Sequence, residues 1–269
     1  MQKVKKQYGI WTGIAMVIGI VIGSGVFIKA GGVLSKTGGD LKTALLAWFI
    51  GGLIMITSGF CFAVFATKVR KFNGVVDYVE SATNQKVGYF IAWTLTTLYY
   101  PIITAVVSIF AGRYFFSMFG LHYAFGDWQV LLFAFSFITL AVILNYYSPK
   151  LSAKFQVSST AIKLIPIALI VVVGLFAGLI IGPEYGIVNA FKNSAETGVT
   201  NFGAAVTTTA FAYEGWVCAT SINAELKDSK KNLPRALVFG TIAILAFYIL
   251  YYITISLHFS FFYIIFIVF

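Results

Sequence analysis

The ten residues from Gly19 to Ile28 read GIVIGSGVFI, and nine of them are apolar or glycine. Such a run is typical of a membrane-spanning helix, yet each glycine of Gly23-Ser24-Gly25 costs a helix interior about 1 kcal/mol relative to alanine. Unwound backbone in a bilayer is tolerated only where it is buried in protein or lines a cavity. The stretch therefore predicts either a functional break or a G-x-x-x-G packing face formed by Gly19 and Gly23.

The composition places the chain in a membrane. Of its 269 residues, 59% are hydrophobic and 10% are charged, whereas soluble domains are roughly half apolar and a quarter charged. Seven charge-free runs predict seven spans, because about 20 helical residues cross the hydrocarbon core, and the first run exceeds the ~7 to 15 apolar residues of a signal peptide. We expect a transmembrane domain over residues 1–257, with spans at 9–28, 43–67, 87–112, 128–148, 157–182, 200–222 and 236–257, and an atypical hydrophobic tail over 258–269.

Lysine and arginine are distributed unevenly between the loops that join these spans. If the N-terminus is cytoplasmic, the inner segments hold thirteen of these residues and the outer segments hold five. This excess satisfies the positive-inside rule, so the N-terminus is expected in the cytoplasm. The net charge of +10 then predicts no nucleic-acid partner, because basic inner loops face the anionic headgroups of the lipid bilayer.

The sequence contains no cluster of residues typical of enzymes. Cys61 and Cys218 fall inside predicted spans, and His122 and His258 are far apart in the sequence. No group has metal-ligand or haem-ligand spacing, and no serine-histidine-aspartate order stands out. We therefore predict no catalytic residues, no metal and no cofactor, with a membrane enzyme or channel kept only as an alternative.

Two charged residues fall inside predicted spans, where a charge at the bilayer centre costs about 2.5 to 3.5 kcal/mol. Lys163 either snorkels to the headgroups at the inner end of its span or is a fixed cation that faces a polar cavity. Pro166 favours the cavity, because a proline frees nearby backbone carbonyls. Glu214 lies too far from either end of its span to snorkel, so we expect it to face protein or water.

A second interrupted segment decides between the interpretations of the opening stretch. TTTAFAYEGWVCATSINAE (Thr207 to Glu225) is rich in small and hydroxylated residues and carries Glu214-Gly215 at its middle. Two broken helices are expected when a helical repeat recurs inverted, with the binding site between the breaks. A half-helix that restarts at Ser24 or Gly25 offers N–H groups to a carboxylate, and the preceding half-helix offers carbonyls to an ammonium. Together they suit an amino acid.

Three stretches carry a resemblance to a known family: IGIVIGSGVFI (Ile18 to Ile28), FNGVVDYVESATNQKVGYFIAW (Phe72 to Trp93) and FAYEGWVCATSINAELKDSKKNLPRAL (Phe211 to Leu237). They resemble the amino acid-polyamine-organocation (APC) superfamily, most of all its L-type amino-acid transporters and bacterial serine/threonine exchangers. The resemblance implies an all-α polytopic membrane protein of the LeuT-type fold with discontinuous helices 1 and 6. It also implies an alternating-access amino-acid transporter of the bacterial plasma membrane, with sodium-independent exchange or proton coupling.

The resemblance also implies the roles of particular residues. The substrate carboxylate is expected at the backbone of Gly23, Ser24 and Gly25, and Phe211 is expected to act as a gate. Lys163 stands where sodium-coupled relatives place a sodium ion. The expected ligands of the substrate ammonium are the carbonyls of Val21, Ile22, Phe211, Ala212 and Glu214.

The sequence departs from the family in three places. Glu214 replaces the glycine of many animal members, which leaves the substrate class open. The loop from Phe119 to Asp127 has no cysteine, so we expect no disulfide-linked heavy chain. The sequence predicts seven spans where family members have about twelve, which suggests a truncated chain. The alternative to a transporter is therefore a fragment that inserts into the membrane but does not transport. The end of the chain is alternatively a tilted helix with an interfacial tail.

Overall fold

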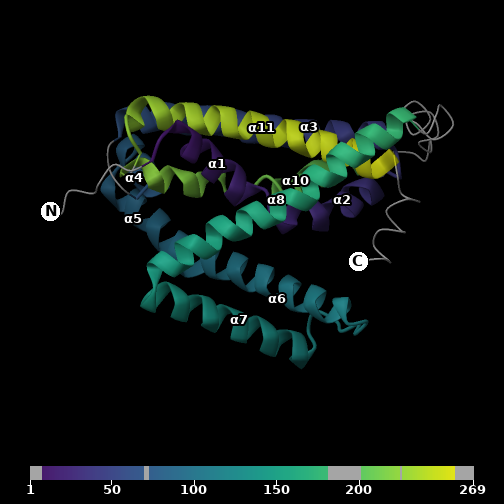
Figure 1. Cartoon of the computed structure of the whole chain (residues 1–269). Helices are drawn as coiled ribbons and strands as arrows, with labels where there is room; N and C mark the ends of the chain where they lie inside the picture. The colour runs from purple at the N-terminus through teal and green to yellow at the C-terminus, as the bar shows by residue number, and fades with distance from the viewer. Residues whose placement is uncertain (1–7, 70–72, 181–200, 225, 258–269) are drawn as a thin grey trace. The chain divides into compact units, whose positions relative to one another are not determined.

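The computed structural model describes residues 8–69, 73–180, 201–224 and 226–257. The expected tail at 258–269 and the charged residues of 181–200 lie outside these ranges. In the described part, helices are joined by loops and by one parallel bridge between Tyr8 and Leu226. The helices are α1 (Ile10–Val21), α2 (Ser24–Lys36), α3 (Leu41–Lys68), α4 (Val75–Ala82), α5 (Gln85–Thr94), the π-helix η1 (Leu95–Tyr99), α6 (Tyr100–Met118), α7 (Trp128–Tyr147), α8 (Pro149–Ile180), α10 (Phe202–Ala210), the 3-10 helix η2 (Trp216–Ala224) and α11 (Ser229–Leu257) (Figure 1).

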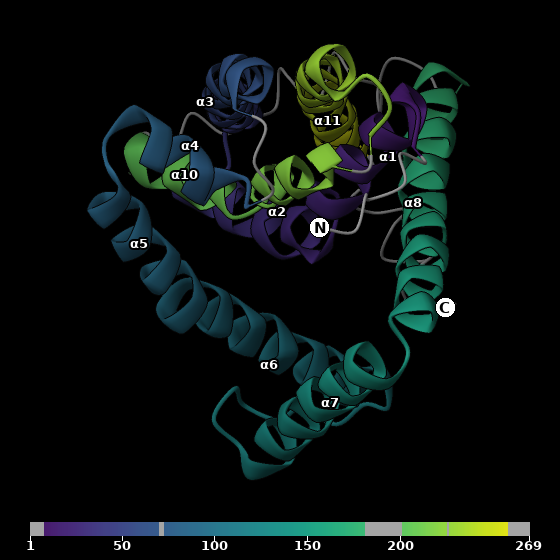
Figure 2. The ribbon, with the colours of Figure 1, turned by 90° about the vertical axis from the view of Figure 1, so that its left-hand side faces the viewer.

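The chain forms two compact units, residues 1–78 with 160–269 and residues 79–159. In the first unit, α11 lies along both α3 and α1 (Figure 2). Small residues allow this close packing: a side chain at Gly240 would overlap Val17, with Cβ at 2.7 Å from its Cγ1. At the centre, the buried Trp48 of α3 packs edge-on against Tyr213 and Tyr248, at 5.7 and 5.6 Å between ring centroids.

The first predicted break is present in the structure. α1 ends at Val21, Ile22 and Gly23 are extended, and α2 restarts at Ser24. The two half-helices bend by 52° at this point. The bend follows from the local sequence, because Gly23 contributes no side chain that favours a helix and its backbone is free to extend.

The second predicted break is also present. α10 ends at Ala210, and the turn that follows runs to Gly215, after which η2 begins as a 3-10 helix. Gly215 has a φ of 105°, which glycine adopts without the steric cost that other residues meet. The expected discontinuity of both helices is therefore confirmed, as is the all-α class of the fold.

The second unit is a helical hairpin. α6 packs on α7 through Gly112, where a Cβ would lie 3.1 Å from the carbonyl oxygen of Val130. The π-helical turn η1 ends two residues before Pro101. Its placement has a physical cause, because a proline removes one helical hydrogen bond and its ring crowds the carbonyl four residues earlier, at Thr97.

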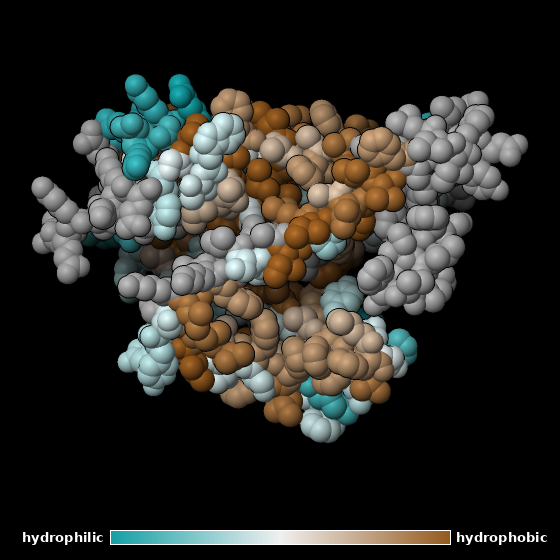
Figure 3. All heavy atoms as spheres, in the orientation of Figure 1, coloured by the Kyte–Doolittle hydropathy of each residue, from teal (hydrophilic) through white to brown (hydrophobic). Residues whose placement is uncertain are grey.

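Among the described residues, four helices are long and apolar enough to cross a membrane, and the bent pair α1–α2 is a fifth candidate. The four are α3, the continuous helix Gln85–Met118, α7 and α11 over Ser229–Thr254. Large apolar side chains are exposed along them, such as Phe135 of α7 at 70%, and apolar residues cover much of the face in Figure 3. Such surfaces suit lipid, so the chain is an integral, multi-pass membrane protein.

Candidate functional site

The two breaks lie against each other in the first unit. A Cβ added to Gly25 would lie 2.8 Å from Cα of Ala212 and 3.2 Å from the carbonyl oxygen of Phe211. One added to Gly215 would lie 3.0 Å from Cγ2 of Ile20. The structure therefore brings together three of the residues predicted for the site, Gly25, Phe211 and Ala212, although the two segments are nearly 190 residues apart.

The start of α2 offers hydrogen-bond donors to a ligand. The first N–H groups of a helix have no partner within the helix and carry the positive end of its dipole. Gly23 is the N-cap of α2 and supplies no side-chain hydrogen bond to them. The first turn of α2, which includes Gly25, is therefore able to bind an anion through its backbone. The side chain of Ser24 lies outside the described part of the chain.

Tyr248 of α11 joins the carbonyl ends of the two breaks. Its hydroxyl lies 3.1 Å from the carbonyl oxygen of Val21 and 2.9 Å from that of Ala212, and donates its proton between them. The side chain is buried, at 1% exposure. Sequence analysis missed this residue, and the only signal was a tyrosine-rich stretch, FYILYYI (Phe247 to Ile253), within an otherwise aliphatic span.

Lys163 contacts the first break from α8. Its ammonium donates to the carbonyl oxygen of Gly19, in the last turn of α1. The side chain is half-buried. This position differs from the snorkelling alternative, in which the ammonium reaches the lipid headgroups.

The remaining predicted residues surround the break in different ways. Ile22 is fully buried in the core, and its N–H donates to the carbonyl of Ile18 at 2.8 Å. Phe211 is half-buried, and the ammonium of Lys29 lies 4.9 Å from the centroid of its ring. Glu214 is half-buried. Tyr213 anchors this segment to α3, because its hydroxyl donates to the carbonyl oxygen of Trp48 at 2.9 Å.

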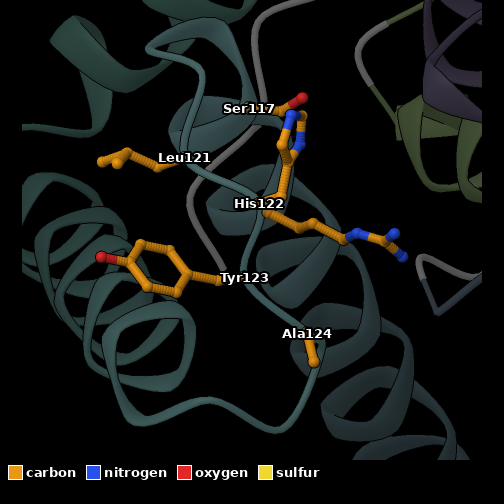
Figure 4. A pocket seen from close by; sticks show the side chains of 6 residues that line it. Ser117, Leu121, His122, Tyr123 and Ala124 are labelled. Atoms are coloured by element: carbon orange, nitrogen blue, oxygen red, sulfur yellow. The ribbon is translucent and has the colours of Figure 1, made fainter.

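The described part of the chain contains no group of three or more histidine, cysteine or acidic side chains that could hold a metal ion. Cys61 and Cys218 are exposed, and neither forms a disulfide. The second unit has a separate pocket of about 270 Å³ at the end of α6, lined by Arg113, Ser117 and residues 121–124 (Figure 4). None of the residues predicted for the site lines this pocket.

The chain is similar to a known family of sequences and to several curated proteins. The sequence model of the family described as amino acid permease matches residues 8–266. The serine/threonine exchanger SteT of Bacillus subtilis is 33% identical over 245 residues, covering 91% of this chain and 53% of that protein. The human large neutral amino acids transporter small subunit 2 is 30% identical over 247 residues, covering 90% and 45%.

The human cystine/glutamate transporter is 26% identical over 248 residues, covering 92% of this chain and 49% of that protein. The chain thus spans about half the length of the curated relatives it matches. All three relatives are named for the transport or exchange of amino acids, and none of them is named as an enzyme.

Proposed function

Since the chain belongs to the amino acid permease family, we propose that it carries amino acids across a membrane and binds them between its two broken helices. The observation that supports this most is the contact of the two breaks at Gly25 and Ala212, where a Cβ would lie only 2.8 Å from the opposing backbone. The first turn of α2 thus lies beside the carbonyl of Phe211 in the second break. In many transporters, discontinuous helices of this kind form the substrate site near the middle of the membrane.

The chemistry of the two breaks suits the two charged ends of an amino acid. The carboxylate is proposed to bind the backbone N–H groups of Gly23, Ser24 and Gly25, where the helix dipole favours negative charge. The ammonium is proposed to bind carbonyls of both breaks, those of Val21, Ile22, Phe211, Ala212 and Glu214. Tyr248 does not prevent this, because a carbonyl oxygen has two lone pairs and can accept a second hydrogen bond.

Lys163 is proposed to replace a coupling ion. A carbonyl at the end of α1 that accepts a hydrogen bond from an ammonium needs no sodium ion to satisfy it, and a second cation beside the lysine would be repelled. The contact with Gly19 therefore supports exchange or proton coupling without sodium. Phe211, which follows α10 directly at the edge of the break, is proposed to gate the site.

The location and partners of the chain are also proposed. The excess of basic residues in alternate loops supports a cytoplasmic N-terminus, and the similarity to a Bacillus exchanger supports a bacterial plasma membrane. The absence of cysteine from Phe119 to Asp127 argues against a heavy chain bound by a disulfide in that loop. Labelling of single introduced cysteines from each side of the membrane tests the orientation.

Competition for binding tests the proposed site. Purified protein in lipid nanodiscs is incubated with radiolabelled L-serine and L-leucine, together with ethanolamine, which lacks the carboxylate, or with glycolate, which lacks the amine. Hydrogen bonds to charged groups contribute about 1.5 to 3 kcal/mol, so each analogue is expected to bind at least about tenfold more weakly than the labelled amino acid. Displacement by either analogue at the same concentration as by the amino acid would refute recognition of both ends.

A further inference from the structure

Lys29 places a positive charge at the gate of the proposed site. It lies on α2 one helical turn beyond Gly25, the residue that touches the second break. Its ammonium is 4.9 Å from the centroid of the Phe211 ring, within the range of a cation–π interaction. The side chain of an amino acid held between the breaks and covered by Phe211 therefore lies within about one side-chain length of the Lys29 ammonium.

The position of this charge relative to the break is fixed by further contacts. α2 and α10 are tied together where Lys36 donates from its ammonium to the hydroxyl of Thr208. The backbone N–H of Asn201 also donates to the carbonyl of Lys36 at 3.2 Å. Both contacts are made by Lys36, the last residue of α2, so they hold the end of the half-helix that carries Lys29 against α10.

In residues 8–69, 73–180, 201–224 and 226–257, no carboxylate forms an ion pair with the ammonium of Lys29, which lies over the face of the Phe211 ring. The side chain is half-buried, which reduces screening by water and salt. An uncompensated, partly buried cation acts strongly on other charges that come near it.

We propose that Lys29 determines the specificity of the site, by repelling amino acids with cationic side chains in favour of those with neutral or acidic ones. This inference rests on the proposed function, because it concerns the substrate class of the same site. A partly buried charge within the screening length of about 8 Å is expected to change the affinity for a charged side chain by about tenfold, after allowance for partial exposure.

The test compares ratios of affinity in the purified full chain. Radiolabelled L-serine is displaced by L-lysine, L-glutamate and unlabelled L-serine, in the wild type and in Lys29→Met, Lys29→Arg and Lys42→Met. Lys29→Met keeps the apolar stem and removes the charge, and Lys29→Arg keeps both the charge and the contact with the ring. Lys42 is an exposed lysine at the start of α3 and serves as the matched control.

We expect Lys29→Met to increase the affinity for L-lysine relative to L-serine about tenfold and to weaken L-glutamate by a similar factor. Lys29→Arg and Lys42→Met are expected to keep the wild-type ratios. Glu214 is the same in all four proteins, so a change in the ratio reports on Lys29 alone. An unchanged ratio, or an equal loss for all three amino acids, would overturn the inference and leave Lys29 as a support for the Phe211 ring. A wild-type chain that binds none of the three would instead overturn the proposed function itself.

Discussion

Gly25→Ala adds one methyl group at the contact between the two breaks. The new Cβ would lie 2.8 Å from Cα of Ala212, 3.2 Å from the carbonyl oxygen of Phe211 and 3.4 Å from the N of Ala212. Carbon atoms pack best at about 3.5 to 4.0 Å, so the two segments must separate by roughly 1 Å. All three opposing atoms belong to the backbone, which cannot rotate away as a side chain can.

Overpacking of this kind costs about 1 to 3 kcal/mol, which corresponds to roughly a five- to 150-fold change in an equilibrium constant. We expect Gly25→Ala to weaken the binding of L-serine by at least about tenfold, because the donors of α2 and the carbonyls of the second break no longer reach one ligand together. Radioligand binding in nanodiscs measures the affinity, and the melting temperature measures the stability.

Gly31→Ala is the matched control for this substitution. It makes the same change on the same half-helix, but a Cβ at Gly31 meets no atom within 4 Å, and alanine favours a helix over glycine by about 0.5 to 1 kcal/mol. Gly31→Ala is therefore expected to bind L-serine as the wild type does and to melt at the same or a higher temperature. Equal affinities for the wild type and both variants would show that the contact at Gly25 does not shape the site.

Three further predictions concern other contacts. Tyr248→Phe removes a buried hydroxyl that serves two carbonyls, so the free energy of unfolding should fall by about 1 to 3 kcal/mol; an unchanged melting temperature would contradict the bridge. Lys163→Met should reduce exchange or make it depend on sodium, and wild-type exchange would favour a structural lysine. Burial and the adjacent Asp77 raise the pKa of Tyr78, in the short helix α4 outside the spans, to about 12. Because the pKa of a tyrosine in the unfolded chain is near 10, the free energy of unfolding should fall as the pH rises from 10 to 12. The fall should be smaller in Tyr78→Phe, and identical pH profiles for the two proteins would exclude the titration of Tyr78 as its cause.

Local sequence was sufficient to locate the two breaks. Gly-Ser-Gly in the first span and Glu214-Gly215 in the sixth weaken a helix wherever they stand, so their effect is visible without knowledge of tertiary contacts. The positive φ of Gly215 is the kind of backbone conformation that an isolated glycine predicts. The contact between the two breaks could also be predicted, because an inverted repeat brings its two broken helices together at the binding site.

Contacts between distant residues could not be predicted in the same way. Tyr248 lies 36 positions after Ala212 and belongs to no recognisable motif. Its role depends on how α11 crosses both breaks, which only the structure shows. Lys163 is 144 positions from Gly19, and the sequence alone left snorkelling open as an alternative. Gly51 of α3 is a further example, since only the structure shows that a Cβ there would overlap Thr209.

Exchange in proteoliposomes shows whether a substrate site between the broken helices serves transport. Vesicles loaded with unlabelled L-serine receive external radiolabelled L-serine, with and without a sodium gradient, for this chain, its Gly25→Ala variant and a version extended to the length of its relatives. We expect saturable exchange that needs internal amino acid, does not need sodium and is lost in Gly25→Ala. Exchange by the extended version alone would show that transport requires helices beyond these. Absence of saturable exchange and binding from every version, or exchange that Gly25→Ala leaves intact, would contradict a substrate site between the broken helices.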